Sequence, residues 1–76
     1  MILDLIVTKT DDGFNAEVPN IKGCDSWAHD EDGAIDKTIE LVMFYLNIDD
    51  EKKIKLDKTR SAQKHSYYKL VVDKER

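Results

Sequence analysis

The sequence has few of the residues that build disulfides, metal centres and phosphate-binding loops. Its 76 residues include one cysteine, one proline and three glycines. The single cysteine, Cys24, excludes an internal disulfide and a metal site made from several thiolates. Three scattered glycines exclude a glycine-rich phosphate loop. The sequence also lacks an apolar run of about 18 residues, the length that spans a bilayer, so we expect no contact with a membrane.

The first nine residues lack the features of a secretory signal. They carry no basic segment at the start, and Asp4 interrupts the apolar run. We therefore expect no signal peptide and a cytoplasmic protein. A chain of this length forms one domain, residues 1–76, with a thin core and little room for a deep substrate cleft.

Charge is divided unevenly along the chain. Residues 1–48 hold three lysines against ten acidic residues, a net charge of −7, whereas residues 49–76 hold nine basic and six acidic residues, a net charge of +3. Such asymmetry bears on partners rather than on the fold. The acidic part favours a basic protein partner and disfavours nucleic acid, so we expect no direct binding to DNA.

Hydrophobic periodicity predicts an α+β fold of order β-β-β-α-β. Strands are expected at residues 2–9, 14–18, 24–29 and 66–73, and a helix at 31–47. The first three strands form an antiparallel meander with the helix on one face. Residues 1–48 make the core of the domain, residues 49–65 a polar connection, and residues 66–73 a last strand. A crossover through the helix places this last strand beside the first and parallel to it.

The first hairpin is predicted from Asp12-Gly13, a pair that supplies the positive φ angles of a tight turn. A two-residue loop there pairs Val7 with Val18. The alternative register, shifted by one residue, turns Asp4 toward the core and is disfavoured. In the favoured register the core face carries Leu3, Leu5, Val7, Ala16 and Val18.

The predicted helix has more apolar surface than one sheet face can cover. Asp30 is a good N-cap, followed by acids that suit a helix start. At helical spacing the core stripe consists of Ile35, Ile39, Val42, Met43 and Leu46. Leu41 and Phe44 point away from this stripe, and Ala34 and Tyr45 lie to one side. The tail of the chain, a second copy or another protein must cover this surface. The residues expected to contact a partner are Leu41, Phe44, Tyr45 and Trp27.

The sequence gives little evidence for a group of residues that could form a catalytic or metal site. Asp4, Glu40 and Asp73 fall on elements that carry Mg²⁺-binding carboxylates in a ribonuclease H site, but sixteen acidic residues make such coincidences common. Cys24 is followed by the acid Asp25 and not by a basic group that would favour its thiolate. The two histidines lack the spacing of metal ligands. We therefore expect a binding protein rather than an enzyme, with no cofactor and no metal ion.

One stretch of the sequence resembles a known family. Gly13-Phe14, Ala16, Val18-Pro19 and Gly23-Cys24, followed by the acidic helix start, resemble the HicB family over about residues 2–48. The resemblance implies a partial ribonuclease H-like fold and an antitoxin that binds and blocks HicA, a small basic ribonuclease. On this resemblance we expect a short form of the family, without the C-terminal DNA-binding domain that many members carry. We also expect the chain to form a homo-oligomer. The alternative function is a homo-oligomeric interaction protein that acts without a toxin.

Overall fold

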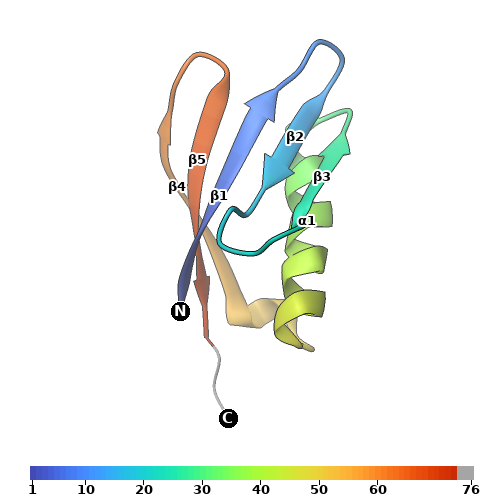
Figure 1. The fold of residues 1–76 in the computed structure, drawn as a ribbon. Coiled ribbons are helices and arrows are strands. Elements are labelled where there is room, and N and C mark those ends of the chain that lie inside the picture. The colour runs from blue at the N-terminus through green and yellow to red at the C-terminus, as the bar shows by residue number, and fades with distance from the viewer. Residues whose placement is uncertain (74–76) are drawn as a thin grey trace.

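The computed structural model describes residues 1–73, which form one antiparallel sheet with a helix on one face (Figure 1). The strand order across the sheet is β3-β2-β1-β5-β4. A short 3₁₀ helix, η1, joins α1 to β4. The elements in chain order are β1 (Ile2–Lys9), β2 (Phe14–Glu17), β3 (Asp25–Ala28), α1 (Glu31–Leu46), η1 (Glu51–Lys53), β4 (Ile54–Ser61) and β5 (His65–Val72).

The predicted α+β class and the meander of β1, β2 and β3 are confirmed, and so is the position of the last strand beside the first. The predicted direction of that strand is wrong, because β5 runs antiparallel to β1. The cause lies in residues 49–65, predicted as a polar connection. They contain η1 and the eight-residue strand β4, which forms a hairpin with β5 and so reverses the chain once more.

The register of the first hairpin differs from the predicted one by two residues. Val7 pairs with Ala16, not with Val18, and Lys9 pairs with Phe14. A four-residue loop, residues 10–13, closes the turn with a hydrogen bond from the Thr10 amide to the Gly13 carbonyl oxygen at 2.8 Å. Because side chains alternate with a period of two, a shift of two residues leaves the predicted core face unchanged.

The core lies between α1 and the sheet. Helix α1 packs mainly against β3 and β2, with a smaller contact to β1 (Figure 1). The buried polar residue Thr38 donates its hydroxyl to the Ala16 carbonyl oxygen at 3.2 Å and lies 2.8 Å from the Ser26 hydroxyl, which binds the helix to β2 and β3. The largest fully buried side chains are Leu5, Leu70, Val18, Val42, Val72 and Thr38.

Helix α1 begins at the predicted residue, Glu31, and ends at Leu46, one residue before the predicted end. The Asp30 side chain accepts a hydrogen bond from the Gly33 amide at 2.6 Å, which satisfies one free donor of the first turn. Asn47 ends the helix in the left-handed conformation at φ 57°, and its amide contacts the carbonyl oxygens of Met43 and Phe44. The expected acids, Glu31 and Asp32, occupy the first turn, where they complement the helix dipole.

A hydrogen bond fastens the start of α1 to β5. The Tyr68 hydroxyl donates to the Glu31 carboxylate at 2.5 Å. Burial first, then this hydrogen bond and the charges of Glu31 and Asp32, raise the pKa of Tyr68 to about 12. In an unfolded chain a tyrosine has a pKa of about 10. The neutral phenol is therefore favoured by folding, and this contribution is complete below about pH 10 and lost as the pH rises toward 12.

Tyr68→Phe is expected to lower the free energy of unfolding by about 1 kcal/mol at neutral pH, because it removes a hydrogen bond to a charged group that is partly exposed to water. It should also remove part of the decline in stability above about pH 10. Urea unfolding of both proteins across this range measures the two effects. Tyr45→Phe, which removes the hydroxyl of a tyrosine that lies outside the core, should follow the parent protein. Identical alkaline profiles for Tyr68→Phe and the parent would contradict the assignment.

Among residues 1–73, no helix combines the length and apolar character needed to cross a membrane.

Candidate functional site

The outer face of α1 carries an aromatic residue in line with carboxylates. Asp36, Glu40 and Phe44 are four residues apart along the chain, so they lie one above another on one side of the helix. Phe44 leaves 78% of its surface exposed. Its ring meets that of Tyr45 edge to face, with centroids 5.7 Å apart and planes at 73°. This stripe, Asp36–Glu40–Phe44 with the neighbouring Tyr45, is called the helix stripe below.

The helix stripe lies in a negative electrostatic field. Two of its four residues are acids, and the last turn of α1 contains no basic residue. The carboxyl end of a helix carries a partial negative charge, and here no cation offsets it within that turn. Phe44 and Tyr45 therefore offer apolar surface in surroundings that attract a positively charged partner.

The residues that follow the helix leave the helix stripe open. In the described part of the chain, residues 49–61 turn away into η1 and β4, beside the helix rather than over its outer face (Figure 1). Tyr45 retains 47% exposure, and its hydroxyl reaches the loop around Gly23, which has a positive φ of 81°. The tail of the chain up to residue 73 therefore does not cover Phe44. Of the three candidates to cover this surface, a second copy and another protein remain.

Leu41, expected on this surface, is not available there. It is half-buried and packs against the core, and Ala34, expected beside the surface, is fully buried. The helix is rotated relative to the predicted stripe: Ala34, Thr38 and Val42 face the sheet at its centre, while Ile39 and Met43 are only partly buried. Small residues at the centre of the contact let α1 approach the strands closely.

Trp27 is on the opposite side of the sheet from the core. Its cross-strand partner is Asn15, while the neighbouring pair Ala16 and Ser26 faces α1. The indole Nε1 donates to the Thr10 hydroxyl at 3.2 Å, and its ring meets that of His29 edge to face at 4.8 Å. The structure therefore brings Phe44 and Tyr45 together and places Trp27 apart from them.

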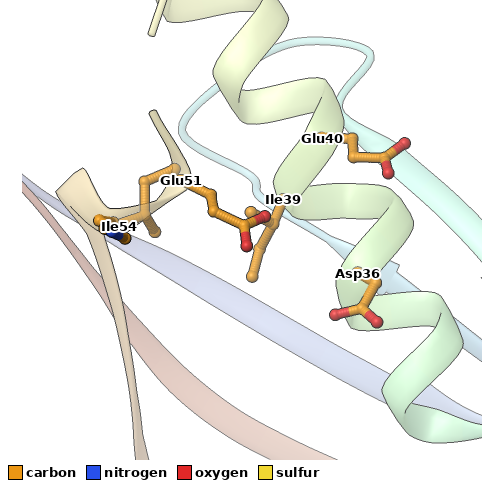
Figure 2. A pocket seen from close by; sticks show the side chains of 6 residues that line it. Asp36, Ile39, Glu40, Glu51 and Ile54 are labelled. Atoms are coloured by element: carbon orange, nitrogen blue, oxygen red, sulfur yellow. The ribbon is translucent and has the colours of Figure 1, made fainter. Parts of the chain in front are cut away.

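A shallow cleft of about 440 Å³ runs beside the helix stripe. Figure 2 shows the side chains of Ile39 and Glu51 extending toward each other across it, with Asp36 and Glu40 on the helix. The cleft thus combines two isoleucines with three acidic residues and one lysine, so its lining carries a net negative charge. Sequence reasoning missed it because Glu51 and Ile54 come from the segment that was predicted as a connection. Its lining residues are Asp36, Ile39, Glu40, Glu51, Lys52 and Ile54.

The three acids of the ribonuclease H-like alternative do not come together. Asp4 lies between the buried residues Leu3 and Leu5, so its side chain faces away from α1, where it forms an ion pair with Lys69. Glu40 lies on the outer face of α1, on the other side of the sheet. Asp73 follows β5, where its amide donates to the Lys53 carbonyl oxygen at 2.8 Å. Within residues 1–73 no three potential ligands lie close enough to hold a metal ion.

Cys24 is buried near the helix. Its sulfur lies 3.8 Å from the Thr38 carbonyl oxygen. Burial, and to a smaller extent the charge of Asp25, raises the pKa of the Cys24 thiol. The thiolate that nucleophilic chemistry needs is therefore disfavoured.

Comparisons of the chain with protein families, with characterised proteins and with solved structures found no match.

Proposed function

We propose that the chain is an antitoxin-type binding module that binds and blocks a small basic ribonuclease of the HicA type in the cytoplasm. The observation that carries this proposal is the exposure of Phe44, 78%, in an acidic helical stripe. The role requires contact with a protein surface and involves no cofactor and no metal ion.

Two physical arguments support a basic protein as the partner. Exposed aromatic residues that become buried on association supply much of the binding energy at protein interfaces. Asp36, Glu40 and the carboxyl end of α1 add a negative field, which speeds association with a basic surface and aligns the two proteins. A ribonuclease presents such a surface to the phosphates of RNA, so a protein bound there excludes the RNA.

The resemblance of residues 2–48 to the HicB family supports the choice of partner class. The matching residues Gly13, Val18-Pro19 and Cys24 shape the hairpin and the loop that support α1. The helix stripe and the acidic cleft beside it supply a contact surface of the charge that a HicA-type protein needs.

Phe44→Ala is expected to weaken binding to a HicA-type ribonuclease by about tenfold or more, because it removes the aromatic anchor. Isothermal titration calorimetry with the purified partners measures the affinity, and an RNA-cleavage assay measures inhibition. The affinity should also fall as salt is added, since the two surfaces have opposite charge.

Gln63→Ala, an exposed and uncharged change in the turn between β4 and β5, away from the carboxyl end of α1 (Figure 1), is the matched control and should bind like the parent protein. Full ribonuclease activity in the presence of excess parent chain would refute the proposed function. Equal affinity of Phe44→Ala and the parent would refute the helix stripe as the contact surface.

A further inference from the structure

The face of the sheet opposite α1 has no second layer in the part of the chain that the structure describes (Figure 1). Alternation along the strands turns the residues next to the buried ones toward this side, which is called the open face. Its apolar side chains include Ile2, 63% exposed, and Trp27, 37% exposed. The other apolar residues of the open face are Ile6, Tyr67 and Val71, all of them half-buried.

One row of side chains crosses the whole open face from one edge of the sheet to the other. The strand registers join Asp25 on β3 to Glu17 on β2 and Glu17 to Ile6 on β1. On the other side Ile6 joins Tyr67 on β5, and Tyr67 joins Arg60 on β4. The row is therefore acidic at the β3 edge, apolar in the middle and basic at the β4 edge.

Neither end of this row forms an ion pair within the described chain. Glu17 and Asp25 lie directly opposite each other, an arrangement of like charges that destabilises a strand pair. Neither forms an ion pair with any residue up to 73. At the other end a register shift after Lys58 brings Arg60 opposite Tyr67, and its guanidinium stacks 4.4 Å from the ring centroid. The bulge thus holds a cation above the open face.

We propose that the open face is the contact surface between two copies of this chain. β1 is the middle strand, so a two-fold axis along β1 places the β3 edge of one copy over the β4 edge of the other. Arg60 of each copy then faces Asp25 of the other, and Tyr67 faces Glu17. Ile6 lies near the axis, and so does Asp4, whose charge is already paired with Lys69 of its own copy. An axis across the strands would instead place acid over acid. Two-fold interfaces are self-complementary in this way.

The size of the open face predicts a weak dimer. β1, β4 and β5 have eight residues each, and β2 and β3 have four. At about 4.8 Å between strands and about 3.3 Å per residue, the face covers roughly 500 Å² per copy. Two copies together bury roughly 1,000 Å², near the lower limit for a specific interface. This inference is independent of the proposed function, because it uses the other side of the sheet and needs no toxin.

Charge reversal at the two ends of the row tests the proposal by sedimentation across a dilution series of the full chain. The parent protein should show a reversible equilibrium between monomer and dimer. Asp25→Arg and Arg60→Glu should each raise the dimer dissociation constant about tenfold or more, because like charges then meet across the axis. Mixing the two variants should restore association, since each contact of the mixed dimer again joins opposite charges.

Both positions are exposed, and the unfolding midpoint of each variant confirms that it is folded. Phe44→Ala, on the other side of the molecule, should dimerise like the parent protein. A parent chain that stays monomeric at every concentration would overturn the proposal, as would failure of the mixed variants to associate. Loss of the dimer in Phe44→Ala would likewise overturn it, because the copies would then meet through α1.

Discussion

Replacing Leu5 with alanine is expected to lower the free energy of unfolding by about 2–5 kcal/mol, the range seen when a buried leucine is truncated and leaves a cavity. Leu5 is fully buried on β1, the middle strand, where it pairs with Tyr68 of β5. A domain of this size has a stability of about 4–11 kcal/mol at 0.05–0.15 kcal/mol per residue. The substitution therefore removes a large part of the total and brings the domain close to unfolding.

Leu56→Ala is the matched control, since it makes the same chemical change on the edge strand β4. Leu56 is 39% exposed and loses less contact when truncated, so we expect a cost of about 1 kcal/mol. Urea unfolding followed by circular dichroism measures both variants. Equal unfolding midpoints for the two variants would contradict a core centred on β1.

Gly13→Ala is expected to destabilise the domain by about 1–3 kcal/mol, because the new methyl group has no space. A Cβ at this position would lie 2.3 Å from the Trp27 ring and 2.4 Å from the Ala28 carbonyl oxygen. The ring can move, but the carbonyl belongs to β3 and moves only if the strand shifts. Thermal unfolding of the variant and the parent protein measures the cost.

Gly13→Asn separates lack of space from turn conformation. Asparagine tolerates a positive φ better than alanine, so it would be the milder change if Gly13 were needed for its backbone angle. Because lack of space is what limits this position in the structure, the larger asparagine should lower the free energy of unfolding at least as much as alanine does. Adding Trp27→Ala should recover only part of the loss, since the Ala28 carbonyl stays in place. A stable Gly13→Asn protein would contradict this explanation.

Gly13 illustrates how a local pattern can find the right residue for the wrong reason. The Asp12-Gly13 pair predicts a two-residue turn with positive φ, yet in residues 1–73 positive φ angles occur only at Gly23 and Asn47. The loop is longer, and the glycine is needed because β3 passes close by. That contact joins residues about fifteen positions apart, and a local turn preference contains no information about it.

The candidate site was predicted in part. Helical spacing correctly placed Phe44 on the outside, since it lies opposite the buried residue Val42. Leu41 was assigned to the outer side of the helix and Trp27 to the contact with a partner, and the position of each depends on tertiary structure. The rotation of α1 on the strands decides that Leu41 packs inward. The pairing of β2 with β3 decides that Trp27 points to the other side of the sheet.

The sequence by itself determined the α+β class, the ends of α1, the meander and the core face of β1, because periodicity and capping are local signals. Only the tertiary structure decided that β4 exists and that β5 runs antiparallel to β1. β4 is an edge strand whose side chains are almost all exposed, and its alternation of apolar and polar residues ends after Ile54 and Leu56. It is held by backbone hydrogen bonds to β5, and those bonds carry almost no sequence signature.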